Sequence, residues 1–148
     1  MSNNCKVIKS SKYYEINSTL RLLGLKTNMN GTKLIRKCIY YIISSDNEFY
    51  MLEDVFQKII LNYPKLNSKQ IRSEIGYALN SRNERLSKKN FEKIFGYEYD
   101  SFIFTPKNFI DELINIIYNA WKYKVLQKYY YILTKNKQKL QKSSYKSM

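Results

Sequence analysis

The stretch NYPKLNSKQIRSEIGYALNSRN, residues 62–83, decides how we expect the chain to fold. A proline-marked turn leads into a polar cluster that begins at Asn67, a candidate helix N-cap. Gln70 follows three positions later and completes a variant of the capping box. Beyond it, apolar residues recur at the spacing of one helical face, at Ile71, Ile75, Ala78 and Leu79. The stretch therefore predicts a turn followed by an amphipathic helix.

The opposite face of this predicted helix is polar and has almost no acidic residue near it. It carries Lys69, Ser73, Gly76, Tyr77 and Asn80, with Gln70 and Arg72 on its flanks. A surface helix usually mixes charges of both signs, whereas a face of this kind is suited to a polyanion. An ordinary solvent-exposed amphipathic helix has the same apolar spacing, so that interpretation stays open.

The charge of the whole chain favours a polyanionic partner. The formal net charge is +14 and the sequence pI is about 9.7. An excess of this size is typical of proteins that bind nucleic acid, and less often of proteins that bind an anionic membrane or an acidic protein. Every acidic residue lies between Glu15 and Glu112, so both ends of the chain carry only positive charge. The alternative is that the lysine-rich composition only keeps the protein soluble.

Length and composition indicate a single helical domain with basic ends. The 148 residues fit one domain with a modest core, and only 4 glycines and 2 prolines favour long helices. We therefore expect an all-α protein, a compact bundle of about six helices with a long C-terminal helix. The expected parts are a flexible basic lead (residues 1–12), a helical DNA-binding domain (13–126) and a basic C-terminal extension (127–148), partly helical and then disordered.

Caps and turn residues predict where the individual helices begin and end. The marker residues are Gly24, Asn30, Pro64, Asn67, Gly96 and Pro106. We expect Gly24 and Gly96 to be C-terminal caps and Asn30 to be an N-cap. A short helix is expected over residues 88–97, and the aromatic connector over residues 98–105 is expected to be extended. Pro106 then opens the long helix.

Several classes of function lack the residues that they need. The chain has no histidine, and Cys5 and Cys38 stand far apart without metal-ligand spacing. We therefore expect no metal, no cofactor, no catalytic residue and no enzyme activity, and no small-molecule substrate is evident. Cys38 lies in an apolar helical stretch and is expected to be a small core residue. Because no signal peptide or membrane-spanning run is apparent, we expect a cytoplasmic, nucleoid-associated protein without a membrane partner.

Two helices joined by a short turn are typical of the helix-turn-helix motif, expected here at about residues 50–82. In that motif the second helix, at about residues 68–82, enters the major groove of double-stranded DNA. Gln70 is expected to pair with adenine and Arg72 with guanine. The expected base contacts are Lys69, Gln70, Arg72, Ser73 and Tyr77. The expected DNA-backbone contacts are Asn67, Ser68, Asn80, Arg82, Lys33, Arg36, Lys88 and Lys89.

From about Ile16 to Ile117 the chain resembles the C-terminal DNA-binding domain of sporulation stage-zero protein A, the bacterial response regulator of endospore formation. The resemblance begins in LGLKTNMNGTKLIRKCI, continues through YPKLNSKQIRSEIGYAL as turn and recognition helix, and closes with FGY at 95–97 and the helix start at Pro106. The matching positions in the first segment are Leu23, Gly24, Gly31, Arg36 and Ile39. The resemblance implies an all-helical six-helix domain that binds DNA through a helix-turn-helix and forms dimers on DNA partly through its last helix.

The chain departs from this family pattern in the residues that read DNA. The family's recognition helix has Arg-Val-Glu-Arg where this chain has Gln70-Ile71-Arg72-Ser73. A family arginine and histidine further along correspond to Gly76 and Tyr77. The target sequence of the sporulation regulator is therefore not expected to carry over. We also expect the phosphorylatable receiver domain to be absent, because only a short lead precedes the helical domain.

Two functions remain open on the sequence. The first is a sequence-specific double-stranded DNA-binding protein, acting as a stand-alone transcription regulator or as a plasmid or phage maintenance factor. The alternative is a helical protein-protein interaction module, such as an adaptor or antirepressor, without specific DNA readout. The last helix carries a 3–4 spaced stripe that suits either the core or a second protomer. We expect it to form a homodimer interface, at least on DNA, through Ile110, Ile114, Ile117 and Trp121.

Overall fold

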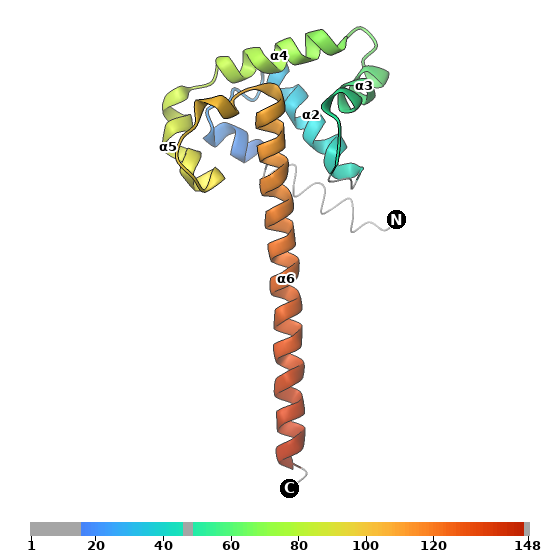
Figure 1. The fold of residues 1–148 in the computed structure, drawn as a ribbon, viewed down its shortest axis with the longest axis vertical. Helices are drawn as coiled ribbons and strands as arrows, with labels where there is room; N and C mark the ends of the chain where they lie inside the picture. Colours follow the sequence, from blue (N-terminus) through green and yellow to red (C-terminus); the bar gives the residue numbers. More distant parts are fainter. Residues whose placement is uncertain (1–15, 46–48, 147–148) are drawn as a thin grey trace. The chain divides into compact units, whose positions relative to one another are not determined.

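The computed structural model of the chain describes residues 16–45 and 49–146, apart from the side chains of residues 121–129 and 137–146. All regular structure in these described residues is helical, which confirms the predicted all-α class (Figure 1). The helices are residues 16–22, α2 (Asn30–Ser44), α3 (Leu52–Asn62), α4 (Ser68–Asn80), α5 (Glu84–Phe95) and α6 (Pro106–Lys146). A short 3-10 helix, η1 (Ser101–Ile103), precedes α6.

The chain divides into two compact units, residues 1–114 and residues 115–148. Helix α6 is assigned through Lys146, so it includes much of the lysine-rich end in which we expected regular structure to be lost. The predicted basic lead, residues 1–12, lies outside the described residues.

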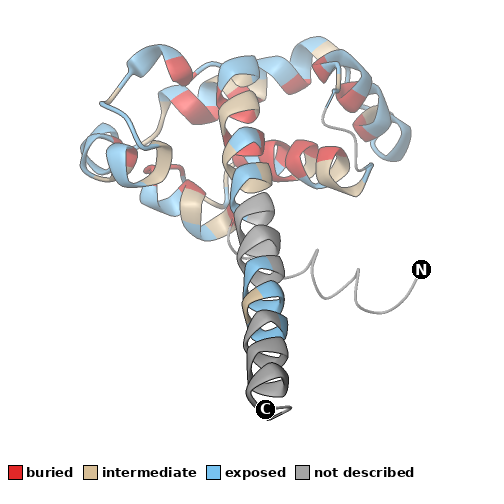
Figure 2. Ribbon diagram, turned by 60° about the horizontal axis from the view of Figure 1, so that its bottom comes forward, coloured by how far each residue is buried: buried red, intermediate tan, exposed pale blue. Residues whose placement is uncertain are grey.

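The core of the first unit is built from the apolar helix faces that the sequence periodicity indicated. In Figure 2 the buried residues, coloured red, recur along each helix of this unit. The largest fully buried side chains are Phe56, Phe91, Phe109, Leu20, Leu23, Ile35, Ile39, Ile42, Ile59, Ile71, Ile75 and Leu79. Each such side chain contributes about 1.5–3 kcal/mol by leaving water. Cys38 is also buried, as predicted, and burial raises the pKa of its thiol to about 12.

Helices α2 and α4 pack closely on each other, with α4 lying across α2 (Figure 1). The contact is closest at Gly31, in the first turn of α2. A Cβ atom at Gly31 would lie 2.0 Å from the backbone oxygen of Glu74 and 2.7 Å from the Cβ of Ala78. Glycine is therefore required here because the backbone of α4 occupies the space of a side chain.

The loop after the first helix is hydrogen-bonded to the loop between α4 and α5. Gly24 has φ +87°, the left-handed conformation of a helix C-terminal cap, which confirms the predicted role of this residue. Its carbonyl accepts a hydrogen bond from the backbone N–H of Asn83 at 2.8 Å. The hydroxyl of Ser87 also donates to the carbonyl of Leu23. These bonds join segments that are far apart in the sequence.

The aromatic connector that follows α5 folds as a cluster rather than as an extended strand. Asp100 accepts a hydrogen bond from the backbone N–H of Phe102 at 3.0 Å, and this cap starts η1. The prediction of an extended connector was therefore wrong. Phe91 of α5 lies at the centre of the cluster, with ring centroids 4.6–6.1 Å from those of Phe95, Tyr97, Tyr99 and Phe104.

Two helix starts differ from the predictions. The N-cap of α2 is Met29 and no side chain caps this helix, so Asn30 is the first helical residue and not the cap. Helix α5 begins at Glu84, before the expected start at residue 88, because the side chain of Asn83 accepts a hydrogen bond from the backbone N–H of Leu86. The expected C-terminal cap of α5 is confirmed, since Gly96 has φ +83°.

Candidate nucleic-acid interface

Helices α3 and α4 are consecutive, and residues 63–67 connect them. One side of α4 is held by the core, since Ile71, Ile75, Ala78 and Leu79 have no exposed surface. The five residues that we expected to contact bases all lie on the exposed side. They are Lys69, Gln70, Arg72, Ser73 and Tyr77. The structure therefore presents them together on one rigidly supported helix.

The first turn of α4 contains the predicted capping box. The side-chain oxygen of Asn67 accepts from the backbone N–H of Gln70 at 2.8 Å, and the side-chain oxygen of Gln70 accepts from the backbone N–H of Asn67 at 3.0 Å. A bidentate contact between Gln70 and adenine would use the same amide oxygen. Adenine recognition by Gln70 would therefore compete with its hydrogen bond to the backbone N–H of Asn67. Asn67 itself has a structural role as the N-cap, besides the expected contact with the DNA backbone.

Glu53, in the first turn of α3, binds two residues of the candidate interface. Its carboxylate accepts from Arg72 Nη2 at 2.8 Å and from Ser68 Oγ at 2.5 Å. The hydrogen bond from Ser68 and the bond from Arg72 lower the pKa of Glu53. The side chains of Arg72 and Glu53 are 46% and 53% exposed, and such ion pairs contribute only about 0–1 kcal/mol. Arg72 can therefore exchange Glu53 for another acceptor at little cost.

Sequence reasoning missed Glu53 because the contact crosses between two helices. The periodicity of α3 places the residue on its polar face, but nothing local pairs it with Arg72. Its position in the first turn of α3 is the one signal available, since acidic residues favour helix N-termini.

Two of the residues that we expected to contact the DNA backbone, Arg36 and Arg82, instead form hydrogen bonds with other residues of the chain, which corrects the prediction for both. Arg36 is only 9% exposed, and its Nη1 donates to the side-chain oxygen of Asn17 at 3.0 Å and to the carbonyl of Thr27 at 3.2 Å. The guanidinium of Arg82 donates to the carbonyl of Leu79 and to the hydroxyl of Tyr99, both at 2.8 Å. Both arginines therefore have structural roles in joining packed elements.

The other expected backbone contacts reach solvent from different elements. Ser68 and Asn80 lie at the two ends of α4, with Ser68 half-buried and Asn80 exposed. Lys33 is exposed on α2, and Lys88 and Lys89 are exposed on α5. Lys88 also pairs with Glu84 at 3.5 Å. Phosphate contacts from these residues stay predictions.

The predicted dimer interface is wrong for two of its four residues. Ile110 has no exposed surface and Ile114 is 4% exposed, so both belong to the core of the first unit and cannot cover a second protomer. Ile117 is half-buried in the second unit. The side chain of Trp121 lies outside the described residues.

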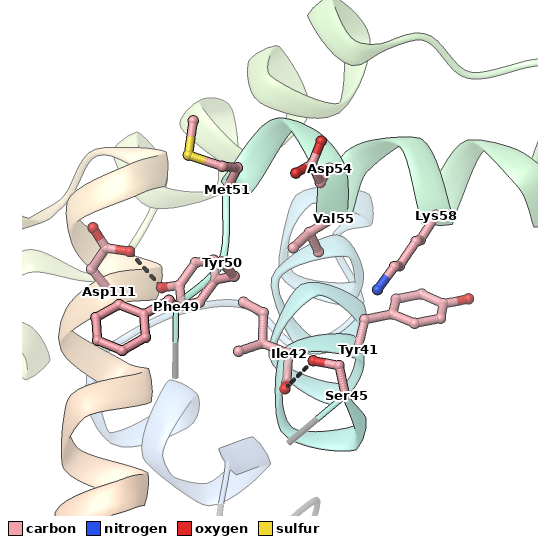
Figure 3. A pocket seen from close by; sticks show the side chains of 10 residues that line it. All are labelled: Tyr41, Ile42, Ser45, Phe49, Tyr50, Met51, Asp54, Val55, Lys58 and Asp111. Carbon is pink, nitrogen blue, oxygen red and sulfur yellow. Dashed lines mark hydrogen bonds between the residues drawn. The ribbon is translucent and has the colours of Figure 1, made fainter. Parts of the chain in front are cut away.

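A separate pocket of about 540 Å³ opens at the C-terminal end of α2 and the start of α3 (Figure 3). Phe49 and Met51 are exposed at its rim, and the hydroxyl of Tyr50 donates to Asp111 Oδ1 at 2.5 Å. None of the expected DNA-contacting residues lines it. In the parts of the chain that the structure describes, no group of three or more histidine, cysteine or acidic residues is placed to hold a metal ion.

Comparison with known proteins does not place the chain in a family. The chain matches no protein-family model, no curated protein and no solved structure. The resemblance to the sporulation regulator's DNA-binding domain therefore rests on its motifs and stays a prediction. Among the described residues, none of the helices combines the length and the apolar character needed to cross a bilayer.

Proposed function

We propose that the chain is a sequence-specific double-stranded DNA-binding protein, acting as a stand-alone transcription regulator or as a plasmid or phage maintenance factor. The observation that carries the proposal is the two-sided character of α4. Its inner side has no exposed surface at Ile71, Ile75 and Leu79, while Lys69, Arg72 and Ser73 are exposed on the other. A helix that enters the major groove needs this combination of rigid support and outward donors.

The charges around α4 suit a duplex partner. Lys69 and Arg72 add positive charge to its outer face, within a chain of net charge +14. Giving up the exposed ion pair with Glu53 costs Arg72 about 0–1 kcal/mol, whereas a bidentate pair with guanine contributes about 1–3 kcal/mol of discrimination. Exchange of Glu53 for guanine is therefore favourable at a site that offers guanine in the right register.

The alternative function, a helical protein-interaction module, is favoured by a different feature of the same surface. Glu53 places a carboxylate directly beside Ser68 and Arg72, and the Gln70 amide oxygen is occupied by the cap. An outer face whose polar groups already have partners is also suited to a protein surface. The two functions differ in whether the chain prefers one duplex sequence over others.

Selection of bound sequences from a random duplex library, at near-physiological salt, separates the two functions. We expect an enriched motif, because base-edge contacts from a fixed helix discriminate among sequences. Arg72→Ala is expected to lose preference at one or more positions of that motif. Lys107→Ala is the matched control, since Lys107 is an exposed lysine in the first turn of another helix, α6. Binding without enrichment would leave only charge-driven association and favour the protein-interaction module.

The same selection tests the proposed homodimer on DNA. A dimer with two-fold symmetry is expected to enrich inverted half-sites about one helical turn apart. Light scattering on the protein, free and bound to the selected duplex, then gives the mass of each species. A single half-site bound by a monomer would remove the dimer from the proposal and leave the readout by α4 intact.

A further inference from the structure

A second pocket, of about 420 Å³, lies on α2 where it meets the C-terminal end of α3. We call it the tyrosine–lysine pocket. Its volume falls within the range of about 300–1,000 Å³ that is usual for small-molecule sites. Its walls include Lys33, Lys37, Tyr40, Tyr41, Asn62 and Tyr63.

The charge of the tyrosine–lysine pocket selects an anionic ligand. Lys33 and Lys37 are one helical turn apart on α2, and Arg36 lies between them. No carboxylate lines the pocket. The C-terminal end of α3 adds about half a negative charge, which the two lysine charges exceed. A phosphate group is a ligand that ammonium groups in this arrangement bind well.

The tyrosine rings of the pocket offer flat apolar surface beside that charge. Tyr40 is 46% exposed and Tyr63 is 44% exposed, although both are large rings. The Nζ atom of Lys37 lies 3.6 Å from the centroid of the Tyr63 ring, so its ammonium covers one face of this ring and has to turn toward the phosphate before a base can stack there. A planar heterocycle stacked on such a ring is stabilised by about 1–3 kcal/mol.

Hydrogen-bonding groups complete the wall between the rings. The Nδ2 atom of Asn62 donates to the hydroxyl of Tyr41 at 2.6 Å, which fixes the orientation of the amide. The second N–H and the carbonyl oxygen of the same amide remain as a donor and an acceptor for the edge of a heterocycle. The pocket thus combines phosphate-binding charge, a stacking surface and an edge-reading amide within one volume.

From this combination we propose that the tyrosine–lysine pocket binds a nucleoside phosphate, with the phosphate on Lys33 and Lys37 and the base against Tyr63. The same chemistry is offered by a free nucleotide and by an unpaired nucleotide of a nucleic-acid strand. The proposal does not depend on sequence-specific readout by α4, because it uses other residues.

Calorimetric titration of the full-length chain tests the proposal with four probes: adenosine monophosphate, adenosine, inorganic phosphate and a short single-stranded oligonucleotide. We expect the monophosphate to bind at least tenfold more tightly than adenosine or inorganic phosphate, because each of these lacks one of the two recognised parts. Binding by the free monophosphate alone identifies a free nucleotide as the ligand. Tighter binding of the oligonucleotide identifies an unpaired nucleotide.

Variants assign any binding to the pocket. Lys37→Gln and Tyr63→Leu are each expected to weaken binding of the monophosphate about tenfold or more. Tyr63→Phe keeps the ring and is expected to retain the affinity, which separates stacking from a general loss of structure. Lys107→Gln is the control for surface charge, since Lys107 is exposed and does not line the pocket.

Two results would overturn the proposal. One is the absence of saturable binding by any nucleotide probe up to about millimolar concentration. The other is binding that Lys37→Gln and Tyr63→Leu leave unchanged while both variants unfold at the same denaturant concentration as the original chain. Neither result bears on the duplex selection.

Discussion

Gly31 of α2 faces the inner side of α4, Gly76 lies within α4, and the contrast between these two glycines separates what packing fixes from what it leaves free. On the inner side, Gly31 of α2 touches the backbone of α4, where an added Cβ would lie 2.0 Å from the oxygen of Glu74. Within α4 itself, an added Cβ at Gly76 would meet nothing within 4 Å. The inner side therefore specifies its residues through steric contact, whereas the outer side is free to vary and to be read by a partner.

The largest expected effect is that of Gly31→Ala on stability. The new methyl group would overlap a backbone carbonyl, which cannot swing away as the end of a side chain can, so α2 must shift from α4. We expect the free energy of unfolding to fall by about 1–3 kcal/mol, the usual cost of overpacking. Denaturant unfolding followed by circular dichroism measures this decrease in the free energy of unfolding. An unchanged midpoint would mean that α2 and α4 are not in this close contact.

On the outer side, Arg72→Ala is expected to change recognition and not stability. Loss of a base contact costs about 1–3 kcal/mol at the contacted position, while loss of the exposed pair with Glu53 costs about 0–1 kcal/mol of folding stability. Binding to the selected duplex and to single-base variants of it measures the first effect, and denaturant unfolding measures the second.

Arg82→Met is the matched comparison for Arg72→Ala. The guanidinium of Arg82 lies 3.6 Å from the centroid of Phe104 and donates to Leu79 and Tyr99, so this half-buried side chain joins three parts of the fold. We expect this variant to lose stability and to keep its sequence preference. The opposite outcome, with Arg82→Met relaxing the preference and Arg72→Ala destabilising the fold, would contradict the division between the two sides of α4.

The sequence predicts the features that depend on a few consecutive residues better than the features that depend on contacts between distant elements. The apolar stripe of α4 and its capping box lie within a few consecutive residues, so periodicity and cap chemistry predict them. The same holds for the left-handed caps at Gly24 and Gly96. Secondary structure of this kind is specified by short-range geometry, and the all-α class followed from it.

The roles of the arginines could not be predicted, because they depend on which elements meet. Arg36 and Arg82 read as surface cations in the sequence, but Asn17 and Tyr99 provide them with partners inside the fold. The apolar spacing of Ile110 and Ile114 likewise indicates that these side chains are buried, but not whether the core or a second protomer buries them. In the structure they are buried in the chain's own core. Long-range packing also created the contact between Glu53 and Arg72.

A smaller effect is expected from removing the cap at the start of α4. Asn67→Ala leaves the backbone N–H of Gln70 without its acceptor and should lower the free energy of unfolding by about 1 kcal/mol. Asn67→Ser retains a capping oxygen and should lose much less. If Asn67 also contacts a DNA phosphate, Asn67→Ser will weaken binding to all duplexes while the stability is nearly kept, which separates the two roles of this residue.

The smallest expected effect completes the comparison between the two glycines. Gly76 lies inside α4, where glycine is less favourable than alanine by about 0.5–1 kcal/mol because its unfolded backbone has more freedom to lose. Gly76→Ala adds a methyl group in open space, so we expect the free energy of unfolding to rise by that amount, opposite in sign to Gly31→Ala. A loss of duplex affinity in this stabilised variant would mean that DNA approaches the backbone of α4 closely at Gly76. Unchanged affinity would instead place the contacts on the longer side chains around it.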